Sequence, residues 1–138
     1  MYEPPKRRKL TKAERQAVYD KCGGHCAYCG FEIPIGKMQA DHVIPMTYYE
    51  SYKFIGEDID NIGNMLPSCR SCNNYKHSLM LESFRSAIER WPEVLMRDSV
   101  TYKNAVRYGL VVPNPKPVKF YFEKMEVRNN DIYRLCGH

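Results

Sequence analysis

Two cysteine pairs, Cys26-Ala27-Tyr28-Cys29 and Cys69-Arg70-Ser71-Cys72, flank the dipeptide Asp41-His42, and the second pair runs directly into Asn73. Paired Cys-x-x-Cys spacing is typical of a tetrahedral zinc site closed by four thiolates. We expect such a zinc ion to be structural, because four protein ligands leave no open coordination position. A carboxylate next to an imidazole, with another polar ligand beside the knuckle, suits metal-assisted phosphodiester hydrolysis. The stretch therefore predicts a zinc knuckle beside a hydrolytic site.

Redox-active or free thiols are the competing interpretation of these cysteines. One Cys-x-x-Cys pair alone is often a redox motif, but two pairs in glycine-rich surroundings favour a metal. The chain has six cysteines and no recognisable export signal, which also favours metal ligation over disulfides. Of the two cysteines outside the pairs, we expect Cys22 to pack at a helix end and Cys136 to lie in a frayed tail.

Bulk properties restrict the class of protein. The chain of 138 residues is long enough for one domain with a modest core, and 43% hydrophobic with 27% charged residues is ordinary for a soluble protein. No apolar run approaches a membrane span, so we expect a cytoplasmic protein without a membrane partner. The net charge of +5 favours polyanionic partners such as DNA. The basic run at residues 6–9 is interpreted first as a solvated arm that can add nonspecific DNA affinity.

Local signals predict an α+β fold with a ββα core. Thr11 and Glu14 have the spacing of a capping box, and Gly23-Gly24 should end the helix that follows. Alternation of apolar and polar residues indicates two short strands, the first ending in Asp41-His42. The expected elements are a helix at about 12–22, a strand at 37–43, a connecting loop at 47–61, a strand at 64–67 and a helix at about 70–77.

Residues 81–138 are expected to form a helical extension of the same domain that ends in a strand. Leu81, Phe84, Ile88 and Trp91 fall on one helical face, and we expect Pro92 to stop that helix. A second helix is predicted at about 93–108, with Gly109 as the residue that follows its last turn. Residues 118–122 alternate as a strand does.

Four segments of the sequence occur in an order that is more specific than any one of them. They are Cys26-Ala27-Tyr28-Cys29-Gly30, Asp41-His42-Val43-Ile44-Pro45, Asn61-Ile62-Gly63-Asn64-Met65-Leu66-Pro67 and Cys69-Arg70-Ser71-Cys72-Asn73-Asn74-Tyr75-Lys76. Together they resemble the HNH endonucleases, and more narrowly the zinc-knuckle enzymes of bacteria and their phages. The resemblance covers about residues 22–78. It implies a ββα-metal fold and metal-dependent cleavage of DNA that leaves 5′-phosphate and 3′-hydroxyl ends.

The resemblance also implies a role for each motif residue. His42 would be the general base, since a neutral imidazole can accept a proton from water near neutral pH. Asp41 and Asn73 would hold the catalytic divalent cation, and the neutral amide oxygen of Asn73 suits Mg²⁺ or Mn²⁺, with Ni²⁺ a further candidate. Asn64 would steady the loop that holds His42. The structural Zn²⁺ would be held by Cys26, Cys29, Cys69 and Cys72.

On this basis the chain is expected to comprise a flexible basic leader at 1–10, an HNH core at 11–80 and the extension at 81–138. Arg70 and Lys76 fall on or beside the last helix of the core, so they are candidate contacts to DNA phosphates. Solvent-facing charges are the simpler interpretation of both.

Several motif residues have a simpler alternative role. Asp41 and His42 could form a solvated turn, and Asn64 could bond only to its own loop. Asn73 could cap a helix, and Asn74 competes with it as a metal ligand.

Two other functions are compatible with the motifs. A noncatalytic zinc-stabilised module that binds nucleic acid would need the cysteines and the basic surface, but not the full set of Asp41, His42, Asn64 and Asn73. The resemblance to small phage proteins also implies a partner-dependent subunit beside a terminase-like packaging ATPase. Sequence specificity, nicking against double-strand cleavage, and oligomeric state depend on surfaces outside the motifs.

Overall fold

The computed structural model describes residues 6–125, and the backbone divides into two compact units. The first unit comprises the described residues up to Leu81 together with those from Lys119, and the second comprises residues 82–118. Helices combine with a two-stranded sheet, which confirms the predicted α+β class. The assignment of residues 81–138 to the same domain as the core stays a prediction. Within residues 6–125, no helix has both the length and the apolar character of a membrane span.

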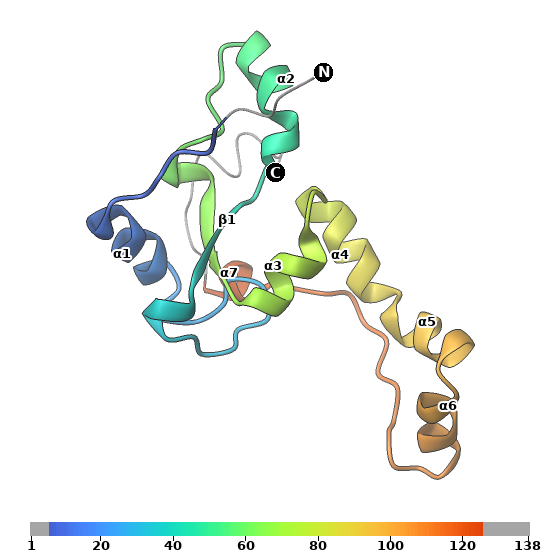
Figure 1. Ribbon diagram of the computed structural model, residues 1–138. Helices are drawn as coiled ribbons and strands as arrows, with labels where there is room; N and C mark the ends of the chain where they lie inside the picture. The colour runs from blue at the N-terminus through green and yellow to red at the C-terminus, as the bar shows by residue number, and fades with distance from the viewer. Residues whose placement is uncertain (1–5, 126–138) are drawn as a thin grey trace. The chain divides into compact units, whose positions relative to one another are not determined.

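The predicted ββα core is present in the first unit. Strand β1 (Gln39–His42) pairs antiparallel with β2 (Met65–Ser68), so that Asp41 lies opposite Leu66 and His42 opposite Met65. Helix α3 (Arg70–Lys76) begins directly after β2, as Figure 1 shows. Its N-cap is Cys69, whose sulfur accepts a hydrogen bond from the Cys72 backbone N–H at 3.4 Å. The second cysteine pair therefore forms the first turn of α3.

Helix α1 (Lys12–Asp20) packs on the sheet through one buried residue. It begins with the predicted capping box, in which Thr11 and Glu14 each bond the other's backbone N–H at 3.1 Å. Val18 is fully buried on the inner face of α1. It belongs to a cluster with Ile33, Met38 and Met65. The first cysteine pair, which follows α1, is held close to β2 by the Ala27 N–H, which donates to the Pro67 carbonyl at 2.8 Å.

The expectation of a long connecting loop at 47–61 is wrong in part. A 3₁₀ helix (Met46–Tyr48) leads into α2 (Tyr49–Phe54) in this segment. Tyr49 and Tyr52 lie on one side of α2 and pack against a buried cluster of Ile44, Met46 and Ile59. Apolar contact at this helical spacing stabilises the short helix. Two further 3₁₀ turns, Ile35–Lys37 and Ile62–Asn64, precede β1 and β2.

The predicted strand at 118–122 is also wrong, because the chain forms helix α7 (Tyr121–Lys124) at this point. The backbone N–H of Phe120 donates to the Glu123 side chain at 3.0 Å instead of to a neighbouring strand. Phe120 and Phe122 are both buried, and each packs edge-on against Tyr28, with ring centroids 5.3 and 6.4 Å from it. The Phe122 N–H donates to the Ala27 carbonyl at 2.8 Å. The alternating aromatic residues thus cover the first cysteine pair.

The second unit contains most of α4 (Leu81–Glu89), α5 (Trp91–Asp98) and α6 (Val100–Arg107). The helix predicted at 93–108 is divided at Ser99, whose extended backbone and hydroxyl, bonded to the Tyr102 N–H at 3.1 Å, start α6. Pro92 lies in the first turn of α5, so it begins a helix where we expected it to stop one. Gly109 has a φ of +73°, as predicted for the residue after a last helical turn.

The covering of the cysteine pair by α7 can be tested with two phenylalanines. Phe122 is 2% exposed and Phe54 is 91% exposed. We expect Phe122→Ala to lower the free energy of unfolding by about 3–5 kcal/mol, because it leaves a cavity beside Tyr28. Phe54→Ala should change it by less than about 0.5 kcal/mol. Urea denaturation measures both, and equal effects would contradict the packing described for α7.

Candidate active site and metal centre

A pocket of about 430 Å³ opens where the carboxyl end of β1 meets α3. Asp41 and His42 reach it from β1, Asn73 reaches it from α3, and His77 follows α3. Arg7 of the basic segment before α1 also lines it. The structure therefore brings three of the residues that the sequence singled out to one concave surface. Antiparallel pairing of β1 with β2, followed at once by α3, is what places them together.

Asp41 is nearly buried, and one of its two carboxylate oxygens is already bonded inside the protein. Oδ2 accepts a hydrogen bond from the Tyr28 hydroxyl at 2.5 Å and lies 3.1 Å from Lys76 Nζ. The described residues give Oδ1 no hydrogen bond. Burial raises the pKa of Asp41 above its usual value, and the charge of Lys76 partly offsets this. The arrangement leaves one carboxylate oxygen of Asp41 for a ligand in the pocket.

Lys76 does not occupy the position that we expected for a phosphate contact. Its side chain is 0% exposed, and Nζ donates to the His42 carbonyl at 3.0 Å in addition to its ion pair with Asp41. A buried ammonium must be paired, and here it joins the end of α3 to the end of β1. The phosphate-contact prediction for Lys76 is therefore wrong in this conformation. Arg70 is exposed at the start of α3 and is not among the residues that line the pocket.

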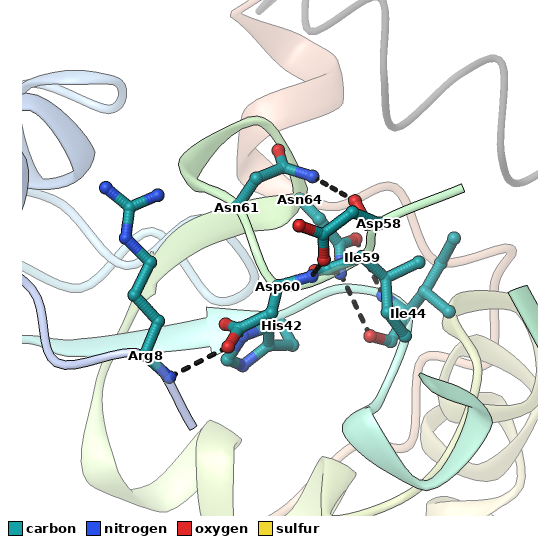
Figure 2. Close-up of polar contacts among 8 residues, drawn as sticks. All are labelled: Arg8, His42, Ile44, Asp58, Ile59, Asp60, Asn61 and Asn64. Atoms are coloured by element: carbon teal, nitrogen blue, oxygen red, sulfur yellow. Dashed lines mark hydrogen bonds and ion pairs between the residues drawn. The ribbon is translucent and has the colours of Figure 1, made fainter. Parts of the chain in front are cut away.

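His42 is 9% exposed, and one of its ring nitrogens is occupied. Nε2 lies 2.9 Å from Oδ1 of Asp60, which is itself 11% exposed. Figure 2 shows the Asp60 carboxylate lying against the imidazole, between Arg8 and the loop that contains Asp58. The sequence interpretation missed Asp60, which stands in an acidic segment without a spacing rule that relates it to His42. The sequence signal that could have identified Asp60 is its position four residues before Asn64.

Asn64 is fully buried and joins the two loops that enclose His42. Its Nδ2 donates to the carbonyl oxygens of Ile44 at 3.0 Å and of Ile59 at 2.9 Å. Its Oδ1 accepts from the Ile44 N–H at 3.0 Å. All of these partners are backbone atoms outside Asn64's own turn, so the side chain fixes the segment after β1 against the segment before β2. These contacts support the loop-holding role expected for Asn64.

Asn73 lies inside α3, whose N-cap is Cys69, so the alternative of Asn73 as a helix cap does not hold. Its Nδ2 donates to Oε1 of Gln39 on β1, and this contact sets the orientation of the Asn73 side-chain amide. Asn74 also lines the pocket, but its side chain is more exposed than that of Asn73. An amide whose nitrogen is bonded to Gln39 can present its oxygen to a cation, which is the chemistry that a ligand at this place requires.

The four cysteines of the two pairs form one cluster. Their sulfur atoms all lie within 4.8 Å of one another, and Sγ of Cys29 is 3.9 Å from Sγ of Cys69. Four sulfurs at 2.3 Å from a tetrahedral zinc ion would be about 3.8 Å apart, so the cluster fits a metal such as zinc. A hydrogen bond from Cys72 lowers the pKa of the Cys26 thiol to about 4 and raises that of Cys72.

Among the described residues, Cys22 is the cysteine that stands apart from this cluster. Cys22 is fully buried at the end of α1, as expected, and burial raises the pKa of its thiol to about 11. Cys136 lies outside the described residues.

Comparison with known proteins adds independent information about this site. Residues 26–79 match the family model of the HNH endonucleases. The chain is 33% identical over 86 residues to the "SPbeta prophage-derived putative HNH endonuclease YoqL" of Bacillus subtilis (strain 168). This match covers 57% of the chain and 34% of the relative, so the chain spans about a third of that protein's length.

A search of solved structures finds the type II-C Cas9 enzyme from Actinomyces naeslundii, with a TM-score of 0.46 and 21% identity. The alignment covers 60% of this chain and 8% of that one. The family match includes both cysteine pairs and all the pocket residues of β1 and α3. Residues 26–79, which hold both the cysteine cluster and the pocket, are thus the part of the chain that is similar to the HNH endonuclease family model.

Proposed function

We propose that this chain is a metal-dependent DNA endonuclease that hydrolyses phosphodiester bonds. The observation that carries the proposal is the single pocket in which Asp41, His42 and Asn73 meet. A binding module has no need to bring a buried carboxylate, an imidazole and an amide to one concave surface. Phosphodiester hydrolysis needs a cation site beside a proton acceptor, and these side chains can supply both.

Asp41 Oδ1 and the amide oxygen of Asn73 are the atoms that would hold the divalent cation. Both are hard oxygen donors, which suits Mg²⁺ or Mn²⁺, and Ni²⁺ is a further candidate. When bound, the cation would supply Lewis-acid polarisation of the phosphate and stabilise negative charge on the departing oxygen. Tyr28 and Lys76 would keep the Asp41 carboxylate fixed, because both bond its other oxygen.

His42 is the proposed general base. Its imidazole accepts a proton from a water molecule, whose oxygen attacks the phosphorus in line with the 3′ oxygen. A new P–O bond forms, the bond to the 3′ oxygen breaks, and that oxygen takes a proton from solvent. The products are a 5′-phosphate and a 3′-hydroxyl. Asn64 would contribute by holding the loops around His42 and not by contact with DNA.

Zinc is the metal proposed for the four-cysteine cluster, in a structural role. Two of the ligands precede β1 in the sequence and two stand at the start of α3, so the ion would fasten α3 to the knuckle after α1. Cys69 stands four residues before Asn73, and Cys72 directly precedes it. Metal in the cluster would therefore also hold the proposed cation ligand in place.

Loss of the proposed base gives the first test. We expect His42→Ala to abolish Mg²⁺- or Mn²⁺-dependent nicking of plasmid DNA, with zinc content and melting temperature unchanged, because general bases contribute roughly 10²–10⁴-fold in rate. His25→Ala removes a histidine that is not among the pocket residues and should keep cleavage. Wild-type rates in His42→Ala would exclude His42 from the mechanism. If the wild-type protein binds DNA but none of the metals supports cleavage, the binding-module or partner-dependent alternatives would be favoured.

The zinc proposal predicts different results for two cysteines. Cys69→Ala should reduce the zinc content, measured by plasma emission spectrometry, and lower the melting temperature by roughly 10 °C or more, because binding energy of structural zinc is folding energy. Cys22→Ala should keep the full zinc content, since Cys22 lies outside the cluster. Unchanged zinc content in Cys69→Ala would contradict the assignment.

We expect substitutions of Lys76 and Arg70 to have different effects, the first on stability and the second on DNA affinity. Lys76→Met leaves the Asp41 carboxylate buried without its cation and should lower the free energy of unfolding by about 3 kcal/mol. Arg70→Met should leave stability almost unchanged and reduce the slope of log affinity for DNA against log salt by about 1, if Arg70 contacts a phosphate. Denaturation curves and salt titrations of DNA binding measure the two effects. A stable Lys76→Met protein would contradict the structural role of Lys76.

A further inference from the structure

The contact between Asp60 and His42 joins the site to parts of the chain outside the family motifs. Asp60 Oδ1 lies 2.9 Å from Nε2 of the imidazole, and both side chains are nearly buried. Asp60 is not among the residues that line the pocket. It therefore touches His42 without facing the space where DNA or a cation would lie. Any effect of Asp60 on the reaction must act through the ring.

Asp60 is itself held in one orientation by backbone groups. Its Oδ2 accepts a hydrogen bond from the Arg8 backbone N–H at 2.8 Å. Its own N–H donates to Oδ1 of Asp58 at 2.9 Å, and the neighbouring Ile59 carbonyl is fixed by Asn64. Figure 2 shows the Arg8 N–H and the His42 ring at the Asp60 carboxylate. Each carboxylate oxygen thus has its own partner, His42 on one side and Arg8 on the other.

This pairing determines which ring nitrogen can act as a base. A carboxylate oxygen only accepts hydrogen bonds, so Nε2 must carry the hydrogen in this contact. The proton-accepting lone pair of a neutral imidazole is then on Nδ1. A fixed acceptor at one nitrogen sets both the tautomer and the direction of the ring.

We propose that Asp60 is a positioning residue that fixes His42 in the Nε2–H tautomer with Nδ1 as the proton acceptor, and that the Arg8 N–H orients Asp60 for this role. The inference rests on the proposed function, since it concerns the same imidazole. It adds a residue outside the motifs and gives the basic segment before α1 a part in the site. The Arg8 contact uses the backbone, so it does not depend on the charge of the Arg8 side chain.

The substitution Asp60→Asn tests the idea almost without a change of shape. The Arg8 N–H needs an acceptor, so the new amide should turn its oxygen toward Arg8 and its NH₂ toward His42. Nε2 must then accept, and the hydrogen moves to Nδ1, the atom proposed as the base. We expect kcat for plasmid nicking to fall about 100-fold or more while KM changes less than about 3-fold, since general-base catalysis contributes roughly 10²–10⁴-fold.

The tautomer can be measured independently of activity. Nitrogen-15 NMR of the histidine-labelled, zinc-loaded chain without added Mg²⁺ reports which ring nitrogen carries the hydrogen, and comparison with His42→Ala identifies the His42 signals. Wild type should show Nε2–H and Asp60→Asn should show Nδ1–H. An Nδ1–H wild-type ring would overturn the proposal without any variant. Wild-type kcat in Asp60→Asn would also overturn it.

A matched pair of second substitutions isolates the backbone contact. Arg8→Pro removes the N–H, so in the Asp60→Asn background the amide can turn its oxygen to His42, and both the Nε2–H tautomer and at least a 10-fold recovery of kcat should return. Arg8→Ala keeps the N–H and should restore neither. If Arg8→Pro and Arg8→Ala gave the same tautomer and the same kcat in the Asp60→Asn background, Arg8 would have no part in orienting Asp60.

The base assignment and the positioning role fail in different ways. Activity that survives His42→Ala would reject the assigned base, whatever the tautomer. Loss of activity in His42→Ala beside a normal Asp60→Asn enzyme would reject only the positioning role.

Discussion

The buried contact between Lys76 and the end of β1 is the constraint on which the site depends. One ammonium group, without exposure to solvent, bonds both the Asp41 carboxylate and the His42 carbonyl. An ammonium buried in this way would be costly without both partners, so α3 can pack only where its last turn reaches β1. The same packing places Asn73, one turn earlier on α3, at the pocket that Asp41 and His42 line. The relative position of Asp41, His42 and Asn73 is therefore a consequence of the burial of the Lys76 ammonium group.

Local chemistry was sufficient to predict much of this arrangement from sequence. The capping box at Thr11, the paired cysteines and the short strand ending in Asp41-His42 are all formed by residues close to one another in the chain, and the structure has each of them. The order of the motifs then implied a ββα unit, which β1, β2 and α3 form. Signals of this kind work because each pattern is formed by residues a few positions apart, even where two such segments then meet in space, as the two cysteine pairs do.

The features that sequence did not predict depend on partners far along the chain. Residues 118–122 alternate like a strand, yet within residues 6–125 no strand pairs with them. The rings of Phe120 and Phe122 instead pack on Tyr28, about 90 residues earlier. From the sequence alone, Lys76 is interpreted as a solvent-exposed charge, and only the structure shows that its Nζ lies 3.1 Å from Asp41. Asp60 is one acidic residue among several until the Asn64 bonds bring its loop to His42. Periodicity and composition carry no information about such contacts.

A common pattern links the groups of the proposed active site: each has one polar atom bonded inside the protein and another left for the pocket. Asp41 uses Oδ2 for Tyr28 and Lys76, and His42 uses Nε2 for Asp60. Bonds of this kind fix the orientation of a side chain before substrate arrives, so little reorganisation remains for the reaction step. The inner partners come from the knuckle, from α3 and from the loop before β2. Those three elements therefore contribute to the chemistry of a pocket that only one of them lines.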